Sequence, residues 1–406
     1  MQLPSDADST GRTLGKEEIA NLTEVIKSGI LTSTKGTFVK KFVAEFAEKY
    51  GFKHCSACSS GTAALHTAIA AINPNPGDEI ITTPITDMGG IITILYQNAI
   101  PIFADTDPYT LNITAETIES MITNKTRAII VVHLFGKPAE MGPIMELSRK
   151  YNIPVIEDCC QAYFAKYKGK NVGTIGDIAC FSLQQGKHMT AGEGGMVCTN
   201  DPQLARRVRL FIDKAWGYGD SKPDHYFLAL NYRMTELVGA VALAQLQKVD
   251  WVVERRRKTA LMLTELLQDI PGLTLPESSP ESEHVFWKYA LIIDTDFFKH
   301  DVFAFSDLLK GKGIFSAPRY IQKPAFMCEV LRDKKTYGDS HYPYEDCPQR
   351  KENPEVVYSP DNYPGTFQAL QNVLVLPWNE FYTKEHVKFI ADNIKEAVNH
   401  FLPKGK

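Results

Sequence analysis

Apolar residues follow two spacings along the first 250 positions of the chain. At 17–28 and 38–50 they recur every three or four residues, and Gly29 and Gly51 follow, which predicts two helices. Short apolar runs, typical of buried strands, come next at 79–83, 100–104, 127–133, 153–157, 178–183 and 196–199. Helical patterns such as 114–123 and 141–151 lie between several of them. This alternation predicts a mostly parallel sheet with helices on both faces, and ligands bind such sheets beyond the carboxyl ends of the strands.

The pattern changes in the second half of the chain. A long helical stretch at 235–267 precedes a strand pattern at 287–293 and a helical pattern at 303–312. We place a domain boundary inside the long helix, which gives a large α/β domain at 1–250 and a smaller α+β domain at 251–406. The segment 333–365 is rich in proline, tyrosine and charge, and it predicts a long loop.

Composition narrows the function classes. The 406 residues have a net charge of −4, with both signs mixed along the chain, so nothing marks a nucleic-acid or anionic membrane surface. No apolar run is long enough to span a bilayer, and the N-terminus lacks the apolar core of a signal peptide. The eight cysteines form no paired metal-ligand pattern. We therefore expect no metal site, buried thiols and a cytoplasmic location.

Three short segments could carry chemistry. Ser60–Gly61–Thr62 opens an apolar helical pattern, so its free N–H groups could bind phosphate or could simply form a helix cap. Asp158 ends an apolar strand, where a carboxylate could hold a cationic ring nitrogen or cap the next helix. Lys187 follows the next strand among glutamines and glycines, and partial burial there would favour Schiff-base chemistry. Together these groups are what pyridoxal phosphate requires.

Ordered motifs then reveal a family resemblance over nearly the whole chain. They are the segments at 31–36, 60–65, 103–108, 132–136, 157–158, 173–177, 192–195, 231–234 and 376–379. On these motifs the sequence resembles the DegT/StrS family of pyridoxal-phosphate-dependent sugar aminotransferases. The resemblance implies the aspartate-aminotransferase-like fold, fold type I, with a mainly parallel sheet in the large domain.

The resemblance also implies the residue roles. Lys187 matches the Schiff-base lysine and Asp158 the partner of the pyridine nitrogen; both are the expected catalytic residues. The remaining cofactor contacts that it implies are Gly61, Thr62, Gln161, Ser182 and Asn231. Gln161 matches the residue beside the ring's phenolic oxygen, and Asn231 matches a residue that reaches the neighbouring subunit's phosphate. We therefore expect a homodimer with shared active sites.

One position departs from the family pattern. Many members stack an aromatic ring on the cofactor where this chain has Asp87. The expected reaction moves an amino group from glutamate or glutamine to a keto-sugar or keto-cyclitol. Two alternatives remain: a dehydratase or aminohydroxybenzoate-type synthase with the same cofactor, and a cofactor-binding regulatory protein without turnover.

The acceptor should contact segments outside the shared motifs. The candidates are polar and aromatic: 216–226, 319–320, and the loop 333–365 with Tyr337, Tyr342 and Tyr344. The glutamine pair Gln184–Gln185 resembles members that act on free cyclitols, which favours an acceptor without a nucleotide. Arginines and lysines in the loop leave a nucleotide-linked acceptor open.

Overall fold

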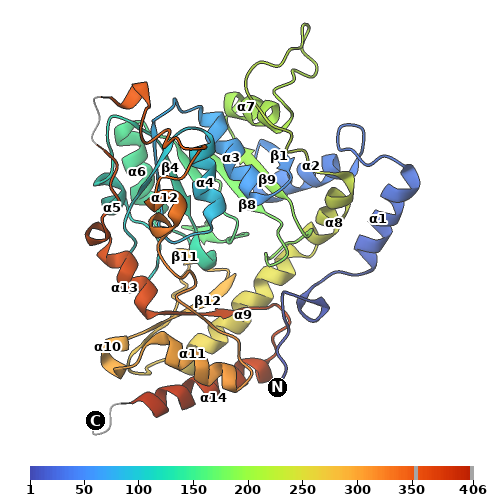
Figure 1. The fold of residues 1–406 in the computed structure, drawn as a ribbon. Coiled ribbons are helices and arrows are strands. Elements are labelled where there is room, and N and C mark those ends of the chain that lie inside the picture. The colour runs from blue at the N-terminus through green and yellow to red at the C-terminus, as the bar shows by residue number, and fades with distance from the viewer. Residues whose placement is uncertain (352–354, 403–406) are drawn as a thin grey trace.

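The computed structural model describes residues 1–351 and 355–402. A seven-stranded sheet in the order β1-β9-β8-β5-β4-β2-β3 forms the centre of the larger part of the molecule (Figure 1). Neighbouring strands from β8 to β3 are parallel, whereas β9 runs antiparallel to both β8 and β1. The strands are β1 His54–Cys58, β2 Glu79–Thr82, β3 Ile100–Phe103, β4 Thr126–Val132, β5 Val155–Asp158, β8 Ile178–Ser182 and β9 Gly195–Thr199.

Both faces of this sheet are buried because successive residues along each strand point to opposite sides. Ile130 packs with α3 and α7 on one face, and its neighbour Ile129 packs with α2, α6 and α8 on the other. Strands buried on both sides read as continuous apolar runs, which is why the sequence identifies them. The helices of this part are α1 Lys16–Ser28, α2 Phe38–Tyr50, α3 Gly61–Ile72, α4 Met88–Tyr96, α5 Ala115–Glu119, α6 Met141–Tyr151, α7 Pro202–Ile212 and α8 Glu236–Leu246.

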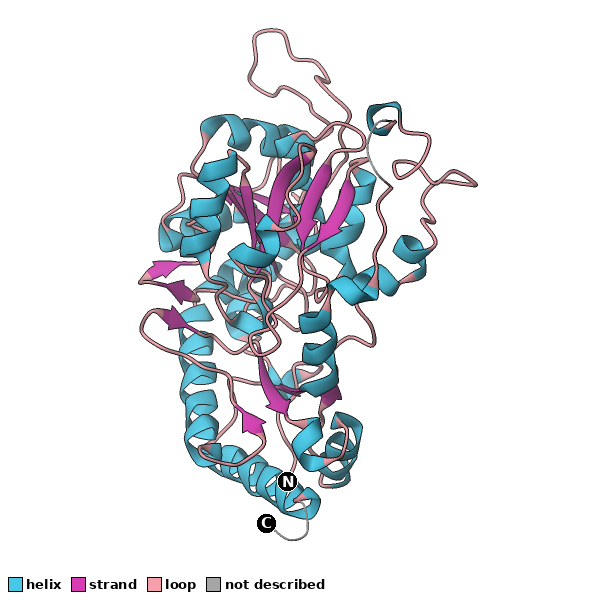
Figure 2. Ribbon diagram, turned by 90° about the vertical axis from the view of Figure 1, so that its left-hand side faces the viewer, coloured by secondary structure: helices cyan, strands magenta, loops and turns pink. Residues whose placement is uncertain are grey.

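A second core surrounds a four-stranded antiparallel sheet in the order β10-β12-β14-β13. Helix α9, Val249–Leu267, connects the two cores: Val249 and Val253 pack with the large sheet, and Leu263 and Leu267 with the small one. Figure 2 shows both ends of the described chain beside the smaller core. The elements of this part are β10 Leu273–Thr274, β12 Lys288–Ile293, α10 Thr295–Phe298, α11 Val302–Gly311, β13 Ala317–Pro318, α13 Pro364–Asn372, β14 Val373–Pro377 and α14 Lys384–Phe401. Helix α12, Glu329–Arg332, packs instead with α4 and β3 at the edge of the large sheet (Figure 1).

The observed elements differ from the predicted ones in several places, and no element was predicted from the sequence at α7, β14 or α14. The helical stretch at 235–267 is two helices, α8 and α9, although Gln247 and Lys248 between them keep right-handed helical angles. Strand β1 was not predicted from the sequence because its residues, HCSAC, are small and weakly apolar. A small sheet of three two-residue strands was also missed: β6 Lys166–Tyr167, β7 Lys170–Asn171 and β11 Ser282–Glu283.

The segment predicted as a long loop, 333–365, does lack long elements where it is described; residues 352–354 lie outside the described residues. Its aromatic residues Tyr344 and Tyr358 pack with Phe103 of β3. Arg350 forms an ion pair with Glu79 of β2, with Nη1 and Oε1 2.9 Å apart. The loop therefore belongs structurally to the edge of the large sheet. No helix in the described part of the chain is long and apolar enough to cross a membrane.

Candidate active site

A cavity of about 360 Å³ opens at the carboxyl ends of the parallel strands. Six of the seven residues expected to bind a cofactor or act in catalysis lie on its wall. They come from the start of α3, the ends of β5 and β8, and the turn after β8. They are Gly61, Thr62, Asp158, Gln161, Ser182 and Lys187.

The start of α3 forms one wall of the cavity. Ser60 caps the helix, since its side chain accepts a hydrogen bond from the Ala63 N–H at 3.0 Å. The N–H groups of Gly61 and Thr62 then remain free of helical partners, at the positive end of the helix dipole. A Cβ atom on Gly61 would lie 2.7 Å from Cβ of Ser182. Glycine is therefore required for the close approach of α3 and β8, and the space in front of both suits an anion.

Asp158, at the end of β5, is a buried carboxylate whose hydrogen bonds come from Cys160 in the turn that follows. It accepts from the Cys160 N–H at 3.0 Å, and its exposed fraction is 6%. Burial raises the pKa of Asp158, and the nearby Lys187 ammonium partly opposes the rise. A cation in the cavity would stabilise the ionised carboxylate further, which is the environment that a protonated ring nitrogen needs.

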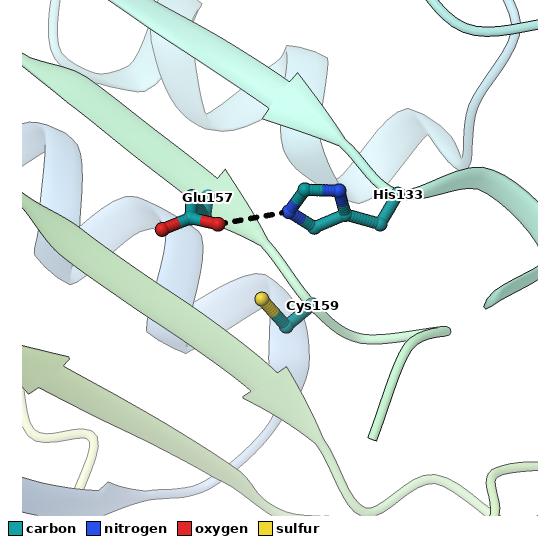
Figure 3. Close-up of side chains that lie close together, drawn as sticks. All are labelled: His133, Glu157 and Cys159. Atoms are coloured by element: carbon teal, nitrogen blue, oxygen red, sulfur yellow. Dashed lines mark hydrogen bonds and ion pairs between the residues drawn. The ribbon is translucent and has the colours of Figure 1, made fainter. Parts of the chain in front are cut away.

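The neighbouring carboxylate, Glu157, faces the opposite side of the sheet and has a structural role. It accepts hydrogen bonds from the N–H groups of Gly173 at 2.7 Å and Ile175 at 2.8 Å. His133 Nδ1 accepts from the Ala139 N–H, so we assign its proton to Nε2, which lies 3.0 Å from Glu157 Oε2 (Figure 3). Glu157 thus fixes the loop before β8 and has no role in the cavity.

Cys159 lies beside this pair, and the three donor atoms fall within 4.8 Å of one another (Figure 3). Such a cluster could be mistaken for a metal site. Glu157 and His133, however, already use their oxygens and nitrogens in hydrogen bonds, and burial raises the pKa of the Cys159 thiol far above its ordinary value. The chemistry of this donor set therefore does not fit a cation.

Lys187 projects over the indole ring of Trp287, with Nζ 4.1 Å from the ring centroid. Burial lowers the pKa of Lys187, and the Cys160 and Asp158 side chains oppose this shift. The Lys187 N–H donates to the Gln184 carbonyl at 2.9 Å, which closes the turn after β8. A lysine with a lowered pKa at the centre of a cavity is suited to covalent chemistry with a carbonyl group.

Gln161 and Tyr320 form the wall opposite α3. The Gln161 side chain accepts from the Phe135 N–H at 2.8 Å and is hydrogen bonded to Tyr320, whose pKa burial raises. Tyr320 and the preceding Arg319 both adopt left-handed φ angles, 57° and 66°, which non-glycine residues rarely do. Through Tyr320, the expected acceptor segment 319–320 contributes to the cavity wall.

The other acceptor segments lie elsewhere in this chain. Tyr337 donates to the Leu95 carbonyl, and neither it, Tyr342 nor Tyr344 lines the cavity in the part of the loop that the structure describes. Residues 216–226 belong to a loop that projects from the molecule beyond α7 (Figure 1). Asn231, at the base of this loop, is exposed and lies outside the cavity of its own chain.

Asp87 lies on the cavity wall as the cap of α4, where its side chain accepts from the Gly89 N–H at 2.8 Å. The aromatic side chains on the wall, within the described residues, are Trp287 and Tyr320. Sequence reasoning missed Trp287 as a site residue because it belongs to the other domain and carries no local signal. The His188 side chain points away from the cavity, with Nε2 3.0 Å from the Val285 carbonyl oxygen.

These groups fit pyridoxal phosphate: an anion cradle shaped by Gly61, a buried carboxylate that forms no ion pair among the described residues, and a lysine with a lowered pKa. The chain matches the model of the DegT/DnrJ/EryC1/StrS aminotransferase family over residues 12–350. It is 38% identical to a GDP-perosamine synthase of Caulobacter vibrioides over 262 residues, which cover 64% of this chain and 70% of that protein. It is 36% identical to the spore coat polysaccharide biosynthesis protein SpsC of Bacillus subtilis over 290 residues, 69% and 74% of the two chains.

The fold agrees with these relatives. The crystal structure of an aminotransferase from Psychrobacter cryohalolentis has a TM-score of 0.84 and 28% identity, with 96% of this chain and 98% of that one covered. The chain therefore belongs to the DegT/DnrJ/EryC1/StrS family and is a pyridoxal-phosphate-dependent sugar aminotransferase of fold type I.

Proposed function

We propose that the cavity around Lys187 is the site at which this enzyme moves an amino group from glutamate or glutamine to the keto carbon of a sugar. The observation that carries the proposal is the meeting of three groups on one cavity wall: the Lys187 ammonium, the Asp158 carboxylate and the free N–H groups at the start of α3. When bound, pyridoxal phosphate supplies the electron sink that makes the donor's α-proton acidic.

The residues divide the remaining work. Gly61, Thr62 and Ser182 hold the phosphate, and Asp158 keeps a negative charge beside the ring nitrogen. Lys187 Nζ binds the cofactor covalently at rest and carries the proton during transfer, for which its lowered pKa favours the neutral amine. His188 cannot take over this role, because its imidazole is buried and burial lowers its pKa well below the ordinary value. The family resemblance implies that dehydrating members have a histidine in place of this lysine, so the presence of Lys187 favours transamination over the dehydratase alternative.

We propose further that the working unit is a homodimer. In the single chain, Ile19 and Ile26 of helix α1 are 66% and 62% exposed. Leu228, in the projecting loop, is 94% exposed. A second copy that covers these side chains would also bring its Asn231 to the cavity, as the family pattern implies. A cytoplasmic location is consistent with the eight cysteines, which are all free.

For the acceptor, the relatives favour a sugar linked to a nucleotide, since one is named for a GDP-linked amino sugar. The glutamine pair suggested an acceptor without a nucleotide, but in the structure Gln185 turns away and donates to the Asp6 carbonyl at 2.9 Å. This removes part of the basis for that preference. We therefore propose a nucleotide-linked keto-sugar, with Tyr320 and the partner's projecting loop as its contacts.

The covalent role of Lys187 is tested by borohydride reduction of the protein with its cofactor, followed by peptide mapping. We expect the label on Lys187. Lys187→Ala should abolish conversion of the cofactor by glutamate while some cofactor still binds through the phosphate cradle. A label on another lysine, with Lys187 unmodified, would disprove the assignment. Normal labelling without conversion by any amino acid would instead indicate a protein that binds the cofactor without turnover.

The acceptor is identified by titrating the amino form of the cofactor in the enzyme with candidate ketones. We expect a GDP- or dTDP-linked 4-keto sugar to restore the absorbance of the aldehyde form at micromolar concentration. The matched control is scyllo-inosose, a cyclitol ketone without a nucleotide. Recovery with scyllo-inosose alone would overturn the proposed acceptor and leave the role of Lys187 intact.

A further inference from the structure

The turn that carries Lys187 is held by its own hydrogen bonds and also by residues from outside the large sheet. Arg12 Nη1 donates to the Lys187 carbonyl at 2.9 Å, and Trp287 Nε1 donates to the Gly186 carbonyl at 2.7 Å. The side chain of Gln185 donates to the Asp6 carbonyl at 2.9 Å. The N-terminal segment and Trp287 of the small domain therefore both form hydrogen bonds with this turn.

Asp6 connects the contacts of the N-terminal segment with this turn to the small domain. Its Oδ1 atom lies 3.0 Å from Arg12 Nη2, 3.1 Å from Arg256 Nη2 and 2.6 Å from Asn379 Nδ2. Arg256 in turn lies 2.7 Å from Glu380 Oε2. The side chains of Arg12 and Arg256 are only 3% and 0% exposed, so removal of one partner would leave an uncompensated buried charge.

Desolvation makes such a buried ionic cluster costly, and an apolar core would serve stability as well. The contribution of the cluster is that it fixes the orientation of the groups that it joins. A guanidinium group donates in a fixed plane, and Arg12 donates from Nε to the Asp6 carbonyl at 3.0 Å and from Nη1 to the Lys187 carbonyl at 2.9 Å. Because that carbonyl bond fixes the peptide plane of Lys187, it also fixes the direction in which the lysine side chain leaves the backbone.

We propose that residues 6–12 form a strap in which Arg12 is a positioning residue: it orients the main chain of Lys187 and ties it, through Asp6, to Arg256 and Glu380 of the small domain. The inference rests on the proposed role of Lys187. It adds that the direction of the Lys187 side chain depends on the N-terminal segment and on the position of the small domain.

The test compares Arg12→Ala with Arg207→Ala. Arg207 is a matched control because it also donates to main-chain carbonyls, those of Ala70 and Ala71, at the end of α3 away from the cavity. We expect Arg12→Ala to lower kcat for amino transfer by roughly 10- to 100-fold while KM for the donor changes by less than about twofold. Guanidinium ion at millimolar concentration should restore part of kcat in Arg12→Ala, and Arg12→Lys should retain more activity than Arg12→Ala.

A second readout is independent of the cofactor. In the full-length apoprotein, amide hydrogen exchange of residues 184–190 should accelerate in Arg12→Ala and stay unchanged in Arg207→Ala. Unchanged exchange, or an equal loss of kcat in both variants, would overturn the strap. If borohydride labels a lysine other than Lys187, the proposed catalytic assignment fails, but the exchange result still decides whether Arg12 orders this turn. Should Arg12→Ala not fold, Arg12→Lys and Asp6→Asn carry the same comparison.

Discussion

Two adjacent carboxylates at the end of β5 show how position determines the role of a residue. Glu157 is fully buried and accepts several main-chain N–H groups, whereas Asp158 faces the cavity and accepts from the Cys160 N–H. Alternation along a strand predicts their opposite orientation from sequence. Their different hydrogen-bonding environments depend on loops distant in the sequence and follow only from the fold.

Asp158→Asn tests the charge at this position. Asparagine can still accept from the Cys160 N–H, so we expect the apoprotein to fold normally. Cofactor binding should weaken by about 1.5–3 kcal/mol, the usual contribution of a hydrogen bond to a charged group, and the rate of cofactor conversion by glutamate should fall further. Equilibrium dialysis and single-turnover absorbance measure the two effects. Near-normal conversion in Asp158→Asn would mean that another group holds the ring nitrogen.

Sequence analysis predicted six of the residues that line the cavity as site residues and missed others, Trp287 among them. Each of the predicted residues lies at a strand end or helix start that its own neighbours define. Trp287 instead reaches Lys187 because β12 enters the small sheet at this point, which no local pattern reveals. Similarly, Tyr337, Tyr342 and Tyr344 have suitable chemistry for a sugar, but the packing of their loop against the sheet edge keeps them from the cavity.

At the scale of elements, α3 connects the phosphate cradle to a buried histidine. His66, on this helix, contacts the Tyr232 hydroxyl through Nδ1 at 2.8 Å and the Gln97 amide through Nε2 at 2.9 Å. Burial lowers the pKa of His66 to about 4. The helix therefore depends on a neutral imidazole, and its stability should depend on pH.

The sign of this dependence follows from the depressed pKa. The unfolded chain binds a proton at His66 near the ordinary histidine pKa of about 6.5, while the folded chain does not do so until about pH 4. This contribution to stability is complete above pH 6.5 and is lost as the pH falls toward 4, by up to about 1.4 kcal/mol per pH unit. Urea unfolding at several pH values should show a shallower decline in His66→Gln than in the parent. The exposed His54 provides a control, and an equal change of slope in His54→Gln would contradict the assignment.

Most elements of the large domain could be read from the sequence because each parallel strand is an uninterrupted apolar run between amphipathic helices. The elements that could not be read are short or depend on distant partners. Strand β1 pairs with β9, about 140 residues later, and its five small residues become a strand only through that pairing. The two-residue strand β11 likewise exists only through its pairing with β6, about 115 residues earlier, whereas β6 and β7 form a local hairpin too short to give an alternating pattern.

At the scale of the whole molecule, the single chain leaves one expected site residue outside the cavity and part of its apolar surface uncovered. Asn231 lies outside its own cavity, and the apolar residues Ile19, Ile26 and Leu228 are largely exposed. Sequence analysis could anticipate the shared site only through family resemblance, because no intrachain pattern encodes a contact between copies. The proposal that two chains complete each other's sites makes both observations parts of one arrangement.

This arrangement predicts complementation between two inactive variants. Lys187→Ala removes the covalent group from its own site, and Asn231→Ala removes the group that the chain would supply to its partner. In a mixed dimer, one site combines an intact Lys187 from one chain with an intact Asn231 from the other, while the second site lacks both. Mixing the two variants under conditions of subunit exchange should therefore restore activity, up to about a quarter of the parent value if chains pair at random and one of two sites works in half of the dimers.

Mixing Lys187→Ala with a Lys187→Ala, Asn231→Ala double variant gives no site with both groups and serves as the control. If exchange is demonstrated by mass and activity does not return, or if the enzyme is a monomer at assay concentration, each site is complete within one chain and the projecting loop needs another explanation.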